Sequence, residues 1–274
     1  MSDAYHALRP GLFRGRTALV TGGGSGIGRV IARRFAALGA QVVVAGRHAE
    51  TLAEAQREIE TEGGACLAHP TDIRQVEQVE ALVAAALARF ARIDFVVNNA
   101  GGQFPARPSE ISDRGWRAVV DLNLNGTWNV LSRVGPHLIA QRFGAVVNVV
   151  HVYALGRGAV TFAHSGAARA GVINMTRSLA AYWARHEVTV NALAPGSIDT
   201  AALREKEYAH LIAEYEARQK EDIPAHRLGT PEEIAEICAF LCSPAARYIN
   251  GAVIVADGAG YLGNWSDPWD MEKP

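Results

Sequence analysis

Cysteine is scarce in this sequence, and its spacing matches no common framework. The 274 residues contain three cysteines, Cys66, Cys238 and Cys242. An odd and sparse set argues against structural disulfides and favours a reducing compartment. Cys238 and Cys242 are four residues apart on an expected helix, but no Cys-x-x-Cys or His-Glu-x-x-His motif completes a metal site. We therefore expect small buried cysteines and no metal.

Long apolar runs and blocks of like charge are also missing. No apolar run approaches the ~18–20 residues that a membrane-spanning helix requires. Residues 1–15 lack the features of a signal peptide, and Glu272-Lys273-Pro274 is not a peroxisomal address. The formal net charge is -1, with no extended basic block that could bind nucleic acid. We therefore expect a soluble cytoplasmic protein that binds neither membranes nor nucleic acids.

Short apolar runs alternate with amphipathic stretches along the chain, which is 49% hydrophobic and can bury a large core. The expected strands are residues 17–21, 41–45, 65–69, 93–97, 145–150, 188–193 and 253–256. The expected helices are residues 27–38, 51–61, 76–90, 116–142 and 165–186. This alternation predicts an α/β protein with a doubly wound parallel sheet, a Rossmann fold. No linker or repeat interrupts it, so we expect one domain over residues 1–274.

Two segments fit this pattern less well. Residues 201–224 are polar and rich in alanine, which predicts one or two helices. The tail from Tyr261 to Pro274 holds Trp265 and Trp269. Contact with a neighbouring subunit and a loosely ordered end are both consistent with this tail.

A glycine-rich loop joins the first expected strand to the first helix. It reads Thr21-Gly22-Gly23-Gly24-Ser25-Gly26-Ile27-Gly28. Glycines let the backbone approach a pyrophosphate closely, and the helix N-terminus offers N–H groups and a positive dipole end to that anion. Most glycine clusters are only turns, but a strand before and a helix after this one predict a dinucleotide site. The candidate contacts are Gly22, Ser25, Gly26, Ile27 and Gly28.

The end of the second expected strand should contact the ribose 2′ position of the dinucleotide. An acidic residue there would accept a hydrogen bond from the free hydroxyl of NAD. This sequence has Ala45-Gly46-Arg47 instead, and a guanidinium matches the geometry of a 2′-phosphate. The alternative is a solvated arginine at the start of a loop. We therefore predict NADP(H) as the cofactor, with Arg47 binding its phosphate.

Several motifs taken together resemble the short-chain dehydrogenase/reductase superfamily from about residue 14 to residue 258. They are the glycine-rich loop, Thr71-Asp72-Ile73, Asn98-Asn99-Ala100-Gly101, Asn123-Leu124-Asn125-Gly126 and Pro195-Gly196-Ser197-Ile198-Asp199-Thr200. The resemblance implies further cofactor contacts at Asp72 and Ile73 for the adenine, at Asn99, Ala100 and Gly101 along the fourth strand, and at Pro195, Gly196, Ile198 and Thr200 around the nicotinamide. It also implies a homotetramer, the usual assembly of the superfamily.

The sequence departs from the superfamily at its catalytic signature, which is a Tyr, three residues and then a Lys, preceded by a Ser. Aligning Ala170-Gly171-Val172 with the family's helix puts Ser165 in the place of the Tyr and Arg169 in the place of the Lys. The usual Ser falls near His151 or Val152. The acid that normally serves ketone reduction is therefore missing.

One branch of the superfamily tolerates this change, namely the 2,4-dienoyl-CoA reductases and the related trans-2-enoyl-CoA reductases of fatty-acid metabolism. The chain resembles them at Gly101-Gly102-Gln103-Phe104, at the stretch from His164 to Val172, at Arg227-Leu228-Gly229-Thr230 and at residues 249–254. The resemblance implies that Tyr153, Ser165 and Asn125 are catalytic, although Tyr153 aligns only with a one-residue insertion. Arg169 would hold the ribose hydroxyls. We therefore expect NADPH-dependent reduction of an enoyl-CoA or dienoyl-CoA double bond.

Other interpretations stay open at this point. The protein could be a carbonyl reductase or alcohol dehydrogenase with an atypical acid, or a catalytically silent cofactor-binding protein. Ser165 could cap a helix, and Tyr153 could be a packed loop aromatic. His151 and His164 could be structural, or one could be the acid. Asn123 and Asn125 could be held by backbone hydrogen bonds.

Overall fold

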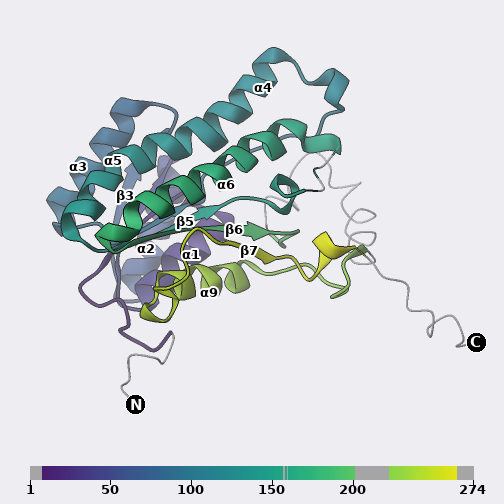
Figure 1. The fold of residues 1–274 in the computed structure, drawn as a ribbon. Coiled ribbons are helices and arrows are strands. Elements are labelled where there is room, and N and C mark those ends of the chain that lie inside the picture. Colours follow the sequence, from purple (N-terminus) through teal and green to yellow (C-terminus); the bar gives the residue numbers. More distant parts are fainter. Residues whose placement is uncertain (1–7, 157, 159, 201–221, 264–274) are drawn as a thin grey trace, which may run out of the picture.

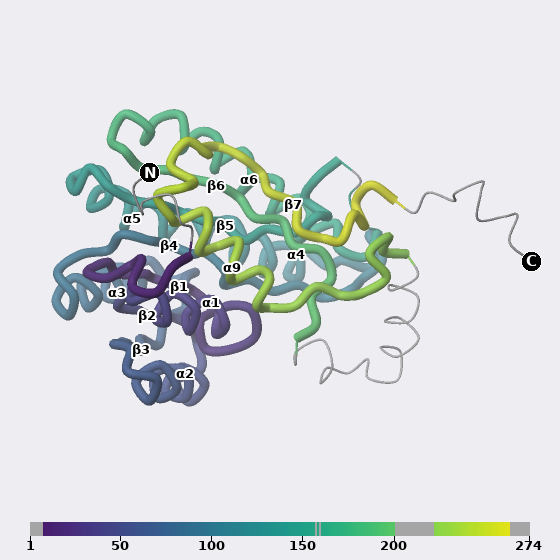
Figure 2. The backbone as a smooth tube through the Cα atoms, turned by 90° about the horizontal axis from the view of Figure 1, so that it is seen from below, coloured from purple at the N-terminus to yellow at the C-terminus, as the bar shows by residue number. Residues whose placement is uncertain are grey.

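A parallel sheet of seven strands runs through the described part of the molecule (Figure 1). The structure is a computed structural model that describes residues 8–156, 158, 160–200 and 222–263. The strands are β1 (Thr17–Thr21), β2 (Gln41–Gly46), β3 (Ala65–Pro70), β4 (Phe95–Asn98), β5 (Gly144–Val149), β6 (Val188–Pro195) and β7 (Val253–Ala256). Their order is β3-β2-β1-β4-β5-β6-β7, which can be followed in Figure 2. The chain therefore changes its winding direction between β1 and β4, where doubly wound sheets bind their ligands.

Helices cover both faces of this sheet. One layer contains α1 (Gly26–Ala37), α2 (Ala49–Thr61) and α9 (Pro231–Cys242), and the other contains α3 (Val76–Phe90), α4 (Asp113–Val120), α5 (Gly126–Gln141) and α6 (Ala163–Trp183). Figure 1 shows α3, α4, α5 and α6 together above the sheet and α1 with α9 below it. The predicted Rossmann fold is confirmed, because the strands are parallel and helices alternate with them.

Alternate residues of the buried strands belong to different hydrophobic clusters. Val42 and Val44 of β2 pack in the cluster that contains α1 and α9, whereas Val43 packs in the cluster that contains α3 and α5. Side chains alternate between the two faces of a strand, so a continuous run of valines fills both cores. Each buried side chain of this size contributes roughly 1.5–3 kcal/mol relative to full exposure.

The predicted helix over residues 116–142 is interrupted in the structure. It consists of α4, a π-helical turn η3 (Asp121–Asn125) and α5. In the turn, the amide of Gly126 donates to the carbonyl oxygen of Asp121, five residues earlier. A π-turn holds one more residue than an α-helical turn, and such turns often occur at functional sites. The extra residue therefore rotates the side chains of α4 relative to those of α5.

Three further expectations concern burial, membranes and the ends of the chain. All three cysteines are buried, and burial raises the pKa of the Cys66 thiol to about 12. No helix in the described residues is long and apolar enough to cross a membrane. Residues 201–221, where helices were predicted, and the tail residues Trp265 and Trp269 lie outside the described part.

A buried carboxylate anchors the amino-terminal edge of the sheet. Asp94 is 0% exposed and accepts hydrogen bonds from the backbone amide of Thr17 (2.9 Å) and from the guanidinium groups of Arg16 (2.9 Å) and Arg92 (2.7 Å). Arg16 also lies over the ring of Phe143, 3.8 Å from its centroid. Asp94 thus ties β1 to the start of β4, at the edge away from the strand ends that carry the cofactor motifs.

Replacing Asp94 with Asn should lower the free energy of unfolding by about 3 kcal/mol, because two partly buried guanidinium groups lose their anion. Urea denaturation monitored by circular dichroism measures this change. The matched control is Glu110→Gln, which removes an exposed ion pair with Arg107 and should cost less than about 1 kcal/mol. Equal losses in the two variants would show that Asp94 is not an anchor.

Candidate functional site

The glycine-rich loop after β1 has the backbone of an anion site. Gly22 and Gly26 have φ angles of +67° and +50°, in the region that favours glycine. A Cβ atom on Gly28 would overlap the carbonyl oxygen of Gly22. Ser25 precedes α1 without capping it through its side chain, and the first turn carries no acidic residue. The first N–H groups of α1 therefore remain available to a phosphate.

A cavity of about 220 Å³ lies at the carboxyl ends of β1, β2 and β4. It brings together eight of the predicted cofactor residues, namely Gly22, Ser25, Arg47, Asp72, Ile73, Asn99, Ala100 and Gly101. It also includes His48 and Thr51, which the sequence analysis did not select. The position at the switch point, the close glycines and the open helix terminus fit a dinucleotide.

The charged residues Arg47 and Asp72 line this cavity near the ends of β2 and β3. Arg47 is exposed there, and Asp72 forms an ion pair with Arg74. Hydrogen bonds from Arg74 lower the pKa of the Asp72 carboxyl, and the charge of Arg47 lowers it further. The guanidinium of Arg47 thus lies close enough to the cavity wall to affect a neighbouring charge.

Thr21 joins the glycine-rich loop to the residues after β4. Its hydroxyl accepts hydrogen bonds from the amides of Asn99 (3.1 Å) and Ala100 (3.0 Å), and the Asn99 side chain donates to the Thr21 carbonyl oxygen (3.2 Å). In the sequence, Thr21 is recognisable only as the first residue of the glycine-rich motif. Its role requires the pairing of β1 with β4, which residue spacing does not reveal.

Arg169 reaches the carboxyl ends of β4 and β5 from helix α6. One Nη donates to the carbonyl oxygen of Val149 (2.7 Å), and a Cβ atom on Gly101 would overlap the guanidinium. Its Nε is buried and has no partner in the described structure. Burial lowers the pKa of Arg169 to about 10, so the group still carries a positive charge at neutral pH. Gly101 is therefore required for the arginine to lie against the strand ends.

The structure assigns the two asparagines of the π-turn to different places. Asn125, predicted as catalytic, is exposed and donates to Asp121 (2.8 Å). Asn123 is buried, exchanges hydrogen bonds with the backbone of Gly102 (2.8 and 3.2 Å), and lies beside Gly101. Asn123 is thus the asparagine that lies next to Arg169, while the amide of Asn125 binds a surface carboxylate.

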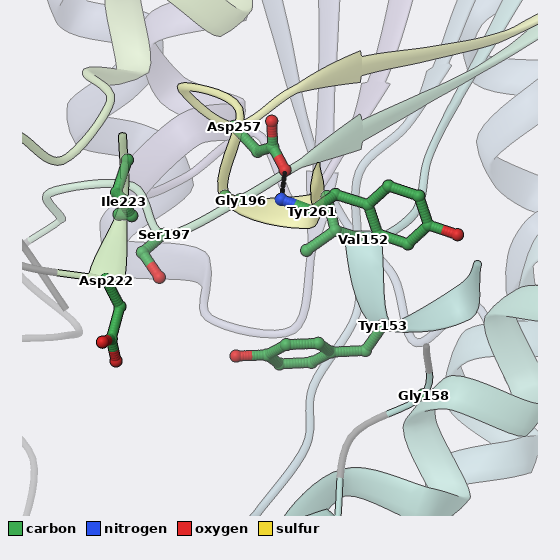
Figure 3. Close-up of a pocket in the computed structure, with 10 residues that line it drawn as sticks. Val152, Tyr153, Gly158, Gly196, Ser197, Asp222, Ile223, Asp257 and Tyr261 are labelled. Atoms are coloured by element: carbon green, nitrogen blue, oxygen red, sulfur yellow. Dashed lines mark hydrogen bonds between the residues drawn. The ribbon is translucent and has the colours of Figure 1, made fainter. Parts of the chain in front are cut away.

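A second cavity, of about 390 Å³, opens beside the ends of β5, β6 and β7. Its wall includes Tyr153, Gly196, Ser197, Asp222, Asp257 and Tyr261. Figure 3 shows the Tyr153 hydroxyl pointing toward the side of the cavity where Ser197 and Asp222 lie. The carboxylate of Asp257 accepts hydrogen bonds from the amides of Ala259 (3.0 Å) and Tyr261 (2.6 Å), which fixes this loop.

The remaining predicted contacts follow β6. Pro195 ends the strand, and Gly196 lines the second cavity. Ile198 is buried and forms an isolated bridge with Gly229. The methyl group of Thr200 lies 4.0 Å from the place that a Cβ atom on Gly26 would take. The segment after β6 therefore approaches the glycine-rich loop, as a shared cofactor site requires.

Tyr153 lies in a stack of rings on the 3₁₀ turn η4 (Val152–Ala154). The His151 ring is stacked on it at 4.0 Å, and the Phe162 ring lies parallel at 5.7 Å. Burial lowers the pKa of His151 to about 3, and the charge of Arg169 contributes. His151 is therefore a neutral imidazole at physiological pH and not a cationic acid.

Ser165 and His164 are buried at the start of α6. Ser165 is 1% exposed, and its hydroxyl has no partner in the described structure. Because α6 begins at Ala163 and its N-cap residue is Phe162, Ser165 does not cap this helix. His164 is 0% exposed, accepts from the Ser165 amide (3.0 Å) and leaves its buried Nε2 unpaired in the described residues. The first turn of α6 thus holds two buried polar atoms, the Ser165 hydroxyl and Nε2 of His164, without a hydrogen-bond partner among the described residues.

Comparisons with known proteins agree with this arrangement. A family model described as Enoyl-(Acyl carrier protein) reductase matches residues 22–261. The chain belongs to the short-chain dehydrogenase/reductase family. The fold and this family imply a nicotinamide cofactor, NAD or NADP, and make the protein an oxidoreductase.

Relatives of this short-chain dehydrogenase/reductase cover nearly the whole chain. A Bacillus subtilis protein named as a probable 2,4-dienoyl-CoA reductase is 38% identical over 256 residues, 93% of this chain and 98% of its own. The peroxisomal 2,4-dienoyl-CoA reductase of Rattus norvegicus is 35% identical over 264 residues, 96% of this chain and 89% of its own. The solved structure of a citronellol catabolism dehydrogenase from Pseudomonas aeruginosa is 41% identical, covers 92% of this chain and 98% of its own, and has a TM-score of 0.81.

The depressed pKa of His151 predicts a pH dependence of stability. The folded pKa of about 3 lies below the ordinary value of 6.5, so the unfolded chain gains a proton first as the pH falls. Folding should therefore weaken between about pH 6.5 and pH 3, and this group should remove up to about 2 kcal/mol on going from pH 7.5 to pH 5. Urea denaturation at the two values should show a smaller loss for His151→Gln. Identical losses would contradict the depressed pKa.

Proposed function

We propose that this protein is an NADPH-dependent reductase of the carbon–carbon double bond of an enoyl-CoA or 2,4-dienoyl-CoA thioester. The observation that carries the proposal is the replacement of the family's usual acid pair. Ser165 and Arg169 occupy those two positions, while the hydroxyl of Tyr153 points into the neighbouring cavity (Figure 3). The names of the relatives from Bacillus subtilis and Rattus norvegicus support the same substrate class.

Reduction of a conjugated thioester makes different demands from reduction of a ketone. A bound dihydronicotinamide would supply hydride to the far end of the conjugated system. The protein must then stabilise negative charge on the thioester oxygen and allow carbon to be protonated. In this proposal Tyr153 is the principal hydrogen-bond donor to that oxygen, and Ser165 assists. The phenol is the most acidic hydroxyl in this region, with an ordinary pKa of ~10.

Arg169 and Asn123 complete the proposed site. Arg169 would hold the ribose hydroxyls and keep the field around the thioester oxygen positive. A guanidinium donates hydrogen bonds but does not exchange its proton readily, which suits the stabilisation of an enolate better than proton relay. We propose Asn123 in place of Asn125 as a positioning residue, because Asn123 is buried beside Gly101 and Asn125 is exposed. The side-chain amide of Asn123 donates to the carbonyl oxygens of Gly102 and Val119, both at 2.8 Å, so it holds the loop beside Arg169 and does not donate to the substrate.

The proposed preference for NADPH depends on Arg47. Replacing Arg47 with Ala should weaken NADPH binding by about 1.5–3 kcal/mol, the range for lost charge-assisted hydrogen bonds, and leave NADH binding unchanged. Fluorescence titration of both nucleotides measures the two affinities. The control is Arg57→Ala, an exposed arginine on α2 that bonds to its own helix. Equal affinity of the parent protein for NADPH and NADH would refute the preference.

The substrate proposal predicts NADPH oxidation with crotonyl-CoA or a 2,4-dienoyl-CoA and little with acetoacetyl-CoA or simple ketones. Tyr153→Phe should lower kcat by ~10²–10³, the scale for losing one oxyanion donor, with nearly unchanged NADPH affinity. Stopped-flow absorbance at the nicotinamide band measures NADPH oxidation with each substrate and the kcat of the variant. Tyr248→Phe is the control, because the Tyr248 side chain is fully exposed.

The same assay separates the alternatives. Efficient turnover of a ketone and none of any enoyl thioester would identify a carbonyl reductase. NADPH binding without turnover of any compound would identify a silent cofactor-binding protein. If Tyr153→Phe keeps parental turnover while Ser165→Ala abolishes it, the acid is not Tyr153.

We also propose a homotetramer and a cytoplasmic location. Large aromatic side chains are exposed on three neighbouring helices, with Trp116 on α4 42% exposed, Trp128 on α5 48% and Tyr182 on α6 56%. Such residues are typical of surfaces that bury area against another subunit. Light scattering of the purified protein tests the assembly.

A further inference from the structure

We infer that His151 is a positioning residue that fixes the direction in which Tyr153 presents its hydroxyl to the cavity. The inference deepens the proposed function and rests on it for its kinetic test. His151 follows β5 directly, near the place where the family's usual serine falls. Both of the contacts described for its ring are with Tyr153.

The first contact sets the backbone of Tyr153. Nδ1 of His151 accepts a hydrogen bond from the Tyr153 amide at 3.2 Å and so caps the turn η4 that carries the tyrosine. An imidazole accepts through Nδ1 only when that nitrogen carries no proton. The contact therefore requires the neutral ring with its proton on Nε2.

The second contact sets the ring of Tyr153. The centroids of the His151 and Tyr153 rings are 4.0 Å apart with an interplanar angle of 25°, and the Phe162 ring lies 5.7 Å from that of Tyr153 at 11°. The carbonyl oxygen of Tyr153 lies 3.1 Å from the place that a Cβ atom on Gly166 would take, so α6 limits the backbone on that side. The phenol thus packs against two aromatic rings, and its hydroxyl extends toward the cavity (Figure 3).

The positive charge of Arg169 helps to keep the His151 ring neutral. Its guanidinium, bound to the carbonyl oxygen of Val149, lies close enough to oppose a second positive charge on His151. Protonation at Nδ1 would turn the acceptor for the Tyr153 amide into a donor facing a donor. The turn therefore retains its cap throughout the pH range of ordinary assays.

Two substitutions separate the two contacts. His151→Asn keeps a side-chain acceptor for the turn and removes the stacked ring, whereas His151→Phe keeps a ring and removes the acceptor. Each should lower kcat about tenfold with KM and NADPH affinity within about twofold, because the effect reaches the substrate only through Tyr153. His186→Asn is the matched control, since His186 pairs with the exposed Tyr182 ring at 6.2 Å.

A double-mutant cycle decides whether His151 acts through Tyr153. In the Tyr153→Phe background the same changes at His151 should alter kcat less than about twofold, because the hydroxyl they position is gone. An undiminished tenfold loss in that background would overturn the inference and make His151 an independent donor. Parental kcat in both single variants would also overturn it. The melting temperature, recorded for every variant, separates these outcomes from loss of folding.

A second measurement needs no substrate and so separates this inference from the proposed function. In protein labelled with 3-fluorotyrosine, the Tyr153 resonance is identified by its loss in Tyr153→Phe. It should shift in His151→Asn, which removes the stacked ring, and stay nearer its parental position in His151→Phe. An unmoved resonance in His151→Asn overturns the inference even if the parent reduces enoyl thioesters. Absence of all enoyl reduction with the expected shifts refutes only the proposed function.

Discussion

The contact of the Arg169 guanidinium with the ends of two neighbouring strands organises the site. The hydrogen bond to Val149 ties α6 to β5, and the overlap that any side chain at position 101 would cause makes Gly101 a requirement of the same contact. A charge held against backbone carbonyls in this way is partly desolvated and cannot move far. Burial keeps His151 neutral, and the positive charge of this arginine adds to that effect.

The two cavities differ in the charged residues that line them: Arg47 and Asp72 line the smaller one, and Asp222 and Asp257 line the larger one. The smaller one is lined by Arg47 and by Ser25 at the N-terminus of α1, a combination that attracts phosphates. The larger one is bordered by Tyr153, by Ser197 and by the loop that Asp257 holds. Arg169 lies at the carboxyl ends of β4, which borders the smaller cavity, and β5, which borders the larger one. One helix, α6, thereby supplies a cation to the site and, in its first turn, two buried polar atoms without partners among the described residues.

Most of the fold could be predicted from the sequence, because strands and helices with long apolar patterns are set by local periodicity. The glycine-rich loop and Arg47 were likewise recognisable, since their order along the chain places them at one end of the sheet. The role of Thr21 was not, because its partners Asn99 and Ala100 lie 78 and 79 residues further along the chain, directly after β4. Ser165 was open to interpretation as a cap until the helix proved to begin two residues earlier. Asn123 and Asn125 could not be ranked, because a π-turn changes the spacing on which such a choice depends.

That π-turn also has a consequence for how this gene can vary in length. Residues 121–125 hold one residue more than a regular helical turn, and Asn123 bonds to Gly102 only in that wider register. Removing any one residue there would restore an uninterrupted helix, and every side chain on the α4 side would rotate by about 100° relative to α5. Substitutions on the exposed face of this helix can accumulate, whereas a single-codon deletion would withdraw the asparagine from the arginine.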